Sequence, residues 1–305
     1  MTTEKRMLVG LVLDGVGADS TEGSESVARL SDAATLADQL GFDLIALDDP
    51  LARAADRTFR LSAVDALAFL ARRTHRIGLV ATSWSHYAEP FHVAKAIATI
   101  DFISGGRAGL IVDPSRSDAA DRFFPAAKDL SPIQRHAEAA EFVSVVGDLW
   151  DSWEDGAEIR DRATGRYVDS AKVHHIDHDG AFFRVKGPLI TPRPPQGRPP
   201  VFLADDRGSA RLVVSPDRGP ATDLVRIRVD SAEAFAEALA AESTAGTRVL
   251  LFLVGPGLIA PLLRDLRNRG IALPGSQTTA GTHLAERLGI SWQPSRFATR
   301  SDEFG

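Results

Sequence analysis

The chain has 305 residues, of which 44% are hydrophobic and 25% are charged, so it has the composition of a folded protein with room for one large barrel or two smaller domains. Its 35 Lys and Arg residues against 41 Asp and Glu residues give a formal net charge of −6, which argues against a nucleic-acid-binding surface. The absence of cysteine excludes disulfides, cysteine metal ligands and cysteine nucleophiles. No run approaches the roughly 18 apolar residues that cross a bilayer, and the N-terminus lacks an apolar signal core. We therefore expect a soluble cytoplasmic protein that binds neither nucleic acid nor a membrane.

Short apolar segments alternate with helical patterns through the first third of the chain. Ser62 is a possible N-cap, and Pro90 suits a first helical position because its missing N–H would be unpaired there. Strands buried on both faces are predicted at residues 7–13, 43–47, 76–82 and 107–113. Helices are predicted at residues 27–40, 62–72 and 90–104. This alternation predicts a parallel sheet, and four such units favour an eight-stranded barrel over a doubly wound sheet.

The middle of the chain combines a helix with a long polar segment. Ser131, Pro132 and Gln134 predict a helix start, with Ser131 as the N-cap and Gln134 reaching back to it. This helix continues to about Trp150. The polar segment from about 151 to 200 is too long for an ordinary connection, and apolar residues at 181–185 predict a short hairpin in it. We expect the segment to pack as an excursion from the main domain.

The second half of the chain is compressed. Further strands are predicted at residues 201–204, 211–214, 224–229 and 248–254, and helices at 232–242 and 257–269. The connections at 205–210 and 215–223 are too short to hold a proper helix. The sequence therefore predicts a single domain over residues 1–305. Its expected fold is a (β/α)8 TIM barrel of class α/β, with covering helices missing from its second half.

Several motifs resemble those of one protein family. The stretch around the helix at 90–104 contains Pro90-Phe91, Ala94-Lys95, Ala98-Thr99-Ile100-Asp101 and Ser104-Gly105-Gly106-Arg107. Further matching words are Leu149-Trp150-Asp151-Ser152-Trp153, Pro194-Pro195-Gln196-Gly197-Arg198-Pro199 and Leu284-Ala285-Glu286-Arg287-Leu288-Gly289. Together they resemble the luciferase-like flavin monooxygenases, in the branch that oxidises nitrilotriacetate, sulfones and long-chain alkanes. The resemblance covers about residues 1–203 and 282–300.

This resemblance implies a barrel of the bacterial luciferase type that binds reduced FMN delivered by a separate flavin reductase. Such an enzyme inserts one oxygen atom from O2 into a small organic substrate. The chemistry of these barrels lies at the C-terminal ends of the strands. The resemblance and this location give the candidate cofactor-binding residues Asp48, Asp49, Thr82, Ser115, His136, Arg207, Gly208 and Ser209. The sequence assigns no catalytic residue, because no nucleophile–base set is visible.

The chain departs from the family pattern at three places that touch the flavin in relatives. The family's asparagine is Ile111 here, and a family histidine is replaced by Pro132. The loop expected to cradle the phosphate contains Asp205-Asp206, whose charges would repel a dianion. These departures suggest an altered flavin pose, a deazaflavin or other ligand, or no catalysis.

An alternative function follows from these departures. The chain could be a non-catalytic luciferase-like barrel that acts as a binding protein or as the partner subunit of an active homologue. Missing outer helices would leave apolar strand faces exposed, and a homodimer or a heterodimer with a homologous barrel would cover them. An open, polar-rimmed pocket at the strand ends would favour a flavin enzyme. Ile111 and Leu110 packed against filling side chains would favour the alternative.

Two other patterns are weaker. His174, His175 and His178 lie close together in the sequence, but their spacing fits no zinc motif, and we predict no metal site. The glycine turn at 254–257 leads from a strand into a helix N-terminus and could bind an anion. Such turns serve mostly as packing connectors.

Overall fold

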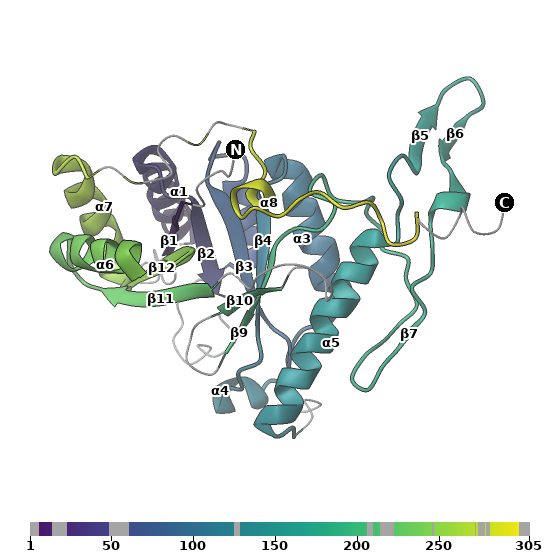
Figure 1. Cartoon of the computed structure of the whole chain (residues 1–305), viewed down its shortest axis with the longest axis horizontal. Helices are drawn as coiled ribbons and strands as arrows, with labels where there is room; N and C mark the ends of the chain where they lie inside the picture. Colours follow the sequence, from purple (N-terminus) through teal and green to yellow (C-terminus); the bar gives the residue numbers. More distant parts are fainter. Residues whose placement is uncertain are drawn as a thin grey trace.

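Eight strands form the wall of a closed barrel. The computed structural model describes residues 6–13, 23–48, 61–124, 129–205, 210–213, 223–245, 247–271, 273, 278 and 281–298. The strands are β1 (Leu8–Val12), β2 (Leu44–Asp48), β3 (Gly78–Trp84), β4 (Ala108–Asp113), β9 (Val201–Ala204), β10 (Ala210–Val213), β11 (Asp223–Val229) and β12 (Val249–Val254). They close in the order β1-β12-β11-β10-β9-β4-β3-β2 (Figure 1). All eight predicted strands are therefore present, and the predicted barrel is confirmed.

One strand runs against the direction that a regular (β/α)8 barrel requires. β10 pairs antiparallel with both of its neighbours, so that Ala210 lies opposite Ala204 on β9 and Leu224 on β11. The other pairs around the barrel are parallel. Residues 205–209 are the whole connection between β9 and β10, whereas a parallel crossover needs about a dozen residues or more. The short connection therefore reverses the strand.

Helices of the described residues cover much of the barrel wall and close its floor. They are α1 (Gly23–Leu40), α2 (Ala63–Leu70), α3 (Pro90–Ser104), α4 (Asp118–Asp121), α5 (Pro132–Asp151), α6 (Ala232–Ala245), the 3-10 turn η2 (Pro256–Leu258), α7 (Ile259–Asn268) and α8 (Leu284–Arg287). The predicted helix signals are confirmed. Ser62 accepts a hydrogen bond from the Asp65 backbone, and Ser131 and Gln134 form a capping box. Gly105 ends α3 with a φ of +69°, a left-handed conformation that glycine adopts without strain.

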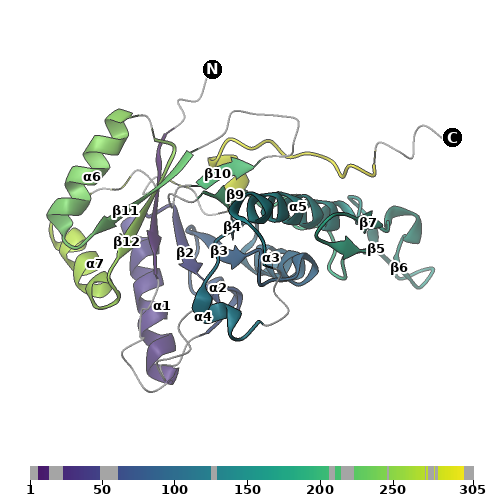
Figure 2. The same cartoon turned by 90° about the horizontal axis from the view of Figure 1, so that it is seen from below.

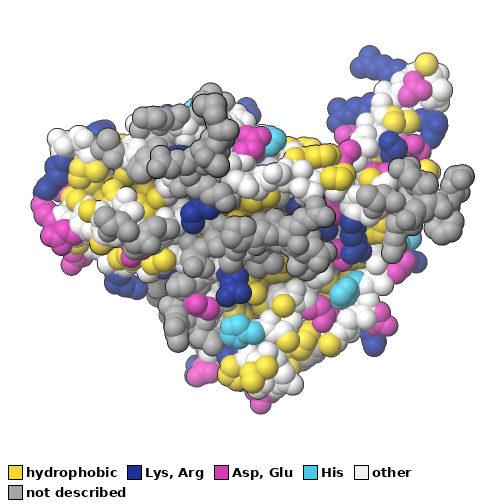
Figure 3. Space-filling model, in the orientation of Figure 1, with side chains coloured by type: hydrophobic (Ala, Val, Ile, Leu, Met, Phe, Trp, Pro, Cys, Tyr) yellow, Lys and Arg dark blue, Asp and Glu magenta, His cyan; other side chains and the backbone are white. Residues whose placement is uncertain are grey.

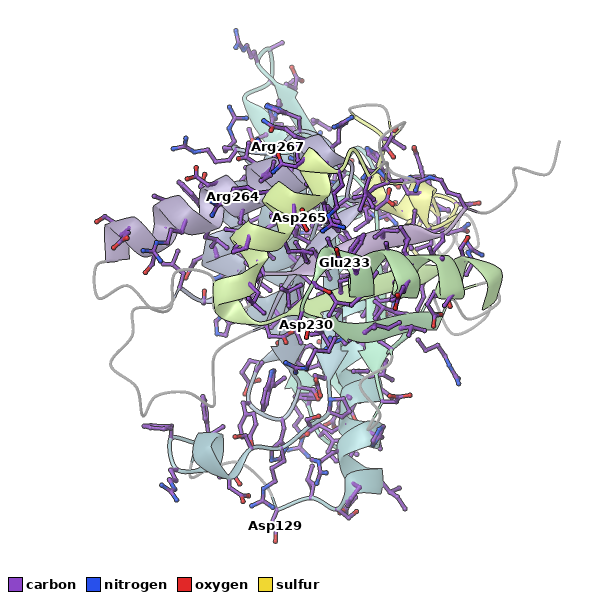
Figure 4. The ribbon with its side chains drawn as sticks, turned by 90° about the vertical axis from the view of Figure 1, so that its left-hand side faces the viewer. Asp129, Asp230, Glu233, Arg264, Asp265 and Arg267 are labelled. Atoms are coloured by element: carbon purple, nitrogen blue, oxygen red, sulfur yellow. The ribbon has the colours of Figure 1, made fainter. Side chains whose placement is uncertain are left out.

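The helical cover is uneven around the barrel (Figures 1 and 2). α6 lies over β11 and β12, with α7 beside it, and Figure 4 shows Glu233 and Asp265 on these two helices. Arg269 joins the helices through ion pairs with Glu233 and Asp265. In the described residues, no helix lies between β9 and β10 or between β10 and β11, as the short connections predict. The outward side chains of Leu203, Val225 and Ile227 are only half-buried there. This side of the wall is the one predicted to lose its cover.

The barrel interior is a closely packed apolar core. Its cluster comprises side chains from every strand together with α8, among them Leu44, Val80, Ile111, Phe202 and Leu251. Gly10 makes room for two of these leucines, because a Cβ atom there would lie 2.4 Å from Leu251 Cδ2 and 2.6 Å from Leu44 Cδ1. The interior is thus filled by side chains, as in other small barrels.

The N-terminal ends of the parallel strands form the barrel floor, where three of the family motifs meet. Leu284 of α8 and Leu288, the residue that caps its C-terminus, are buried in the interior cluster. The Asp101 carboxylate accepts hydrogen bonds from the Ala108 N–H, the Gln196 N–H and the Gln196 side-chain amide. The Gln196 side-chain oxygen in turn accepts from the Ala285 N–H. These motif residues therefore hold α3, β4 and α8 together and are architectural.

The Asp101 carboxyl gives the stability of the floor a pH dependence. Burial raises its pKa to about 6, although the hydrogen bonds from Gln196 and Ala108 favour the ionised form. An unfolded aspartate titrates near pH 4, so the native state binds more protons between about pH 4 and pH 6. The contribution of Asp101 to the free energy of unfolding therefore falls as the pH rises through this window.

We expect the Asp101→Asn variant to lack this dependence. The unfolding free energy of the wild type minus that of the variant should decrease by up to about 3 kcal/mol from pH 4 to pH 6.5, and should stay constant above it. Urea titrations of both proteins across this range measure the difference. The same difference at every pH would contradict the prediction.

Residues 152–200, which we call the arm, leave the barrel wall between α5 and β9 (Figures 1 and 2). The arm contains β5 (Glu158–Asp161), β6 (Arg166–Val168), the 3-10 turn η1 (Ser170–Lys172), β7 (His178–Asp179) and β8 (Arg184–Val185). β7 and β8 form a hairpin around the predicted position. Basic and acidic side chains are interleaved over the arm (Figure 3). That the arm and the barrel make up a single domain stays a prediction.

Two carboxylates of α5 fasten the arm. Glu141 accepts hydrogen bonds from the backbone N–H groups of residues 181–183 and from His178. Asp151 is almost fully buried and receives the guanidinium groups of Arg193 and Arg198 on its two oxygens. The Trp153 indole donates to the Leu189 carbonyl oxygen. The motif Leu149-Trp150-Asp151-Ser152-Trp153 thus attaches the arm to α5. Among the described helices, none is both long and apolar enough to cross a membrane.

Candidate functional site

The C-terminal ends of the parallel strands form the barrel mouth, and the strand registers show which side chains point into it. Side chains alternate along a strand, so residues two apart share a face. Ala46, Val80 and Leu224 all belong to the interior cluster. The residues two positions further along these strands therefore also face inward. They are Asp48 on β2, Thr82 on β3 and Arg226 on β11.

The last inward layer of the barrel combines small and polar residues. Val12 and Ala204 close the apolar cluster at this level. Thr82 is only 2% exposed, and its Oγ1 atom has no hydrogen-bond partner in the described part of the chain. The Nε and Nη2 atoms of Arg226 are buried and likewise lack a partner there. Buried polar groups are nearly always hydrogen-bonded, so the unpartnered atoms of this layer are candidates for contact with a polar ligand.

The predicted site residues are only partly brought together. Asp48 and Thr82 face the mouth from neighbouring strands, where they occupy paired positions. Ser115 lies in the loop after β4, and its N–H donates to the Asp113 carboxylate over 2.8 Å. His136 lies near the start of α5, with Nδ1 2.9 Å from the Pro132 carbonyl oxygen. Asp49, Arg207, Gly208 and Ser209 lie outside the described residues, and all eight assignments remain predictions.

Ile111 and Leu110 occupy different environments. Ile111 is fully buried inside the barrel beside Phe202, its pairing partner on β9. Leu110 is buried on the opposite face of β4, between the wall and the helices. Both residues are thus packed against neighbouring side chains, which is the arrangement expected of the non-catalytic alternative. The polar atoms of Thr82 and Arg226 in the layer above, which have no hydrogen-bond partner among the described residues, fit instead a site that binds a ligand.

The loop after β3 holds titratable groups that the sequence reasoning missed. His86 Nδ1 lies 2.9 Å from Glu138 Oε2 on α5, and both side chains are buried. The Tyr87 hydroxyl donates to Asp121 over 2.7 Å and accepts from the Ser117 N–H. Partial burial, together with the hydrogen bond to Asp121, raises the pKa of the Tyr87 hydroxyl. Their position directly after a predicted strand was a signal that could have indicated them.

Arg226 was missed for a related reason. The segment Leu224-Val225-Arg226-Ile227-Arg228-Val229 alternates in polarity, which places both arginines on the same face as Leu224. In the closed barrel that face is the inner one. The alternation was therefore the available signal for an inward arginine at the mouth.

The three histidines of the arm have separate partners. His174 Nε2 lies 2.6 Å from Glu154 Oε1, and His178 Nε2 lies 3.1 Å from Glu141 Oε1. His175 Nδ1 lies 2.7 Å from the Gly187 carbonyl oxygen. Within the described residues, no group of three or more His, Asp or Glu side chains is arranged to hold a metal ion. These histidines serve to order the arm.

The comparison with known families decides the ancestry. A family model described as "Luciferase-like monooxygenase" matches residues 7–213, which is more than half of the chain. The chain belongs to this family. Its barrel resembles the crystal structure of a long-chain alkane monooxygenase, with a TM-score of 0.67 at 18% identity over 94% of this chain and 96% of that one. The suspected family and its barrel fold are thus confirmed.

The curated relatives show different extents of similarity. N-acetyl-S-(2-succino)cysteine monooxygenase of Bacillus subtilis (strain 168) is 33% identical over 229 residues, which are 70% of this chain and 52% of that protein. One subunit of pristinamycin IIA synthase of Streptomyces pristinaespiralis is 30% identical over 295 residues, 92% of this chain and 95% of that subunit. A second, longer subunit of the same synthase is 37% identical over 156 residues, 51% of this chain and 32% of that subunit. The chain spans about half, or less, of the length of the monooxygenase and of the longer subunit.

Proposed function

We propose that the protein is a two-component monooxygenase that uses reduced FMN and O2 to insert one oxygen atom into a small organic substrate. Membership of the luciferase-like family supports this reaction class. The observation that carries it to this chain is the last inward layer of the barrel, where Thr82 and Arg226 present buried polar atoms without partners among the described residues. Apolar residues alone would suffice to fill a barrel with no ligand at this position.

The polar groups of the mouth fit a flavin phosphate or ring edge, whereas Ile111 offers it no hydrogen bond. Thr82 Oγ1 can donate to or accept from the ring or the substrate. Arg226 can neutralise an anionic group. Glu138 fixes the orientation of the His86 ring by accepting a hydrogen bond from Nδ1, which leaves Nε2 as the hydrogen-bond acceptor of the neutral ring. Bound reduced FMN would supply the electrons and the reaction with O2, and the barrel would exclude water.

The partners follow from the same proposal. A separate flavin reductase would supply the reduced flavin, as the family resemblance implies. A deazaflavin is the alternative cofactor, since the phosphate-binding loop at 205–209 contains Asp205 and Asp206. The small-molecule substrate would enter at the mouth, because in such barrels the strand C-termini carry the chemistry.

The second candidate function is that of a partner subunit. One relative that this chain matches over nearly its whole length is named as a subunit, and the longer subunit of that synthase also matches part of the chain. The half-buried apolar faces of β9 and β11 offer a surface for a homologous barrel. In this case the chain would assemble with a longer luciferase-like protein and would depend on it for activity.

Flavin titration separates the two candidates. The purified chain is titrated with oxidised FMN, anaerobically reduced FMN and a reduced deazaflavin, followed by fluorescence or calorimetry. Low-micromolar binding of reduced FMN would support the monooxygenase, and a reductase-coupled substrate screen would follow. No binding of any flavin up to millimolar concentration would reject catalysis by the isolated chain. Co-purification with a longer homologue, and flavin binding only by that complex, would then support the partner-subunit function.

A further inference from the structure

The inner face of β11 carries a charge that the fold itself does not use. Arg226 is two positions beyond Leu224, which is fully buried in the barrel interior, so its side chain enters the mouth from the wall. Its Cα pairs with Leu251 of β12, whose side chain is also in the interior. The Nε and Nη2 atoms are buried without a hydrogen-bond partner in the described part of the chain. The guanidinium therefore has unused donors in an apolar wall.

The Arg226 side chain as a whole is half-buried, so the cost falls on the two donor atoms that are withdrawn from water without a hydrogen-bond partner among the described residues. Removing a guanidinium from water costs free energy that only a good counter-charge and hydrogen bonds recover. Arg193 and Arg198 illustrate the usual solution, since both bind Asp151. Arg226 differs from them in having two buried donor atoms with no such partner among the described residues. A charge retained at such a cost is typical of a ligand-binding group.

We propose that Arg226 binds an oxyanion group, a carboxylate or a phosphate, of a small ligand that occupies the barrel mouth. This inference rests on the function proposed above, because it takes the mouth to be the ligand site. The planar guanidinium matches the two oxygens of such a group in a bidentate contact.

Two further residues complete the arrangement. Arg228 is the next inward position along β11 and is exposed, so it lies at the rim, where it attracts anions toward the mouth. Thr82, on the far side of the barrel in the strand order, presents its unpartnered hydroxyl to the uncharged part of the same ligand. The mouth would thus select molecules with an anionic end and a polar group several ångströms from it.

The oxyanion could come from the flavin phosphate or from a carboxylate of the substrate. The test uses two variants. Arg226→Met keeps a side chain of similar length and removes the charge, and Arg226→Lys keeps the charge but lacks the planar guanidinium that makes a bidentate contact. Arg228→Met is the matched control for loss of charge at the rim. Four probes are titrated into each protein by calorimetry: inorganic phosphate, malonate, FMN and riboflavin.

The expected result is a much larger loss of anion affinity in the Arg226→Met variant than in the Arg228→Met variant. Phosphate or malonate should bind the Arg226→Met variant at least tenfold more weakly than the wild type, with Arg226→Lys in between. The effect of Arg228→Met should be about twofold and should vanish at high salt. If the preference for FMN over riboflavin disappears in Arg226→Met, the oxyanion is the flavin phosphate. If only malonate binding is lost, the oxyanion is a substrate carboxylate.

Thermal unfolding without ligand gives a second, independent readout. Because the Nε and Nη2 atoms of Arg226 have no hydrogen-bond partner among the described residues, Arg226→Met should melt at the same temperature as the wild type or above it. A clearly lower melting temperature would show that Arg226 is paired in the folded protein and would overturn the proposal. Equal affinity of wild type and Arg226→Met for all four probes would overturn it too. Failure of the proposed function is distinct: FMN then binds in neither redox state, while phosphate or malonate binding still depends on Arg226.

Discussion

Replacing Asp151 by alanine is expected to lower the free energy of unfolding by about 3–5 kcal/mol. The side chain is 2% exposed and receives Arg193 at 3.0 Å on one oxygen and Arg198 at 2.7 Å on the other. Its second oxygen also accepts from the Arg296 N–H, and its carbonyl accepts from Ser295. Alanine would leave Arg193, which is 4% exposed, with only the half-exposed Asp155 as a counter-charge. The arm and the C-terminal segment would lose their common anchor.

Urea titration followed by circular dichroism measures this loss. The matched control is Asp179→Ala, since the Asp179–Arg184 pair lies in the same arm with both side chains more than 70% exposed. That change should cost less than about 1 kcal/mol, as exposed pairs do. Asp151→Asn should fall between the two, because it keeps the shape and loses the charge. A loss below about 1 kcal/mol for Asp151→Ala would show that the ion pairs of Asp151 with Arg193 and Arg198 do not stabilise the native state.

Replacing Arg107 by methionine should cost more than about 3 kcal/mol of unfolding free energy. The side chain is 3% exposed at the barrel floor and donates hydrogen bonds to the backbone oxygens of residues 71, 74, 77 and 104. It also donates to Thr74 Oγ1. Methionine would leave these buried oxygens without a donor, and each unsatisfied group costs about 1–3 kcal/mol before water or local movement compensates.

The lysine variant separates the charge from the shape. Arg107→Lys should be well below the wild type in stability, because a single ammonium group cannot reach all the oxygens that lie around the edge of the planar guanidinium. Arg72→Met, at an exposed position in the same floor region, should change the stability little. The urea-denaturation midpoints of the wild type and of the Arg107→Met, Arg107→Lys and Arg72→Met variants measure these differences in stability. A lysine variant as stable as the wild type would refute the assigned role.

The barrel could be predicted from the sequence because its strands are short apolar runs between clear turn and cap signals. The structure places all eight strands within about two residues of the predicted positions. The reversal of β10 was missed, although the length of the 205–210 connection already contained the information. A pattern of apolar residues predicts that a strand is buried but does not predict whether it runs parallel or antiparallel to its neighbours.

The functional residues were harder to predict, for a physical reason. The family words that identify the chain include Arg107, Asp151 and Gln196, and these side chains turn out to hold the floor and the arm. Family motifs preserve architecture as well as chemistry. Whether a residue lies in the mouth depends instead on which face of its strand points inward. Only the strand pairing of the closed barrel shows that Thr82 and Arg226 both lie there. Asp49 and residues 207–209 lie outside the described parts of the chain.

The reversed strand β10 has a consequence for how a barrel of this kind can become shorter. A hairpin reverses the direction of the strand that follows it. If a single crossover were replaced by a hairpin, every later strand would run antiparallel to the first strands of the barrel. Here two consecutive crossovers are replaced, and β11 and β12 again run parallel to β1. Arg226 consequently keeps its place at the mouth. The parity of strand directions therefore means that hairpins must replace crossovers in even numbers if the last strand of such a barrel is to pair in parallel with the first.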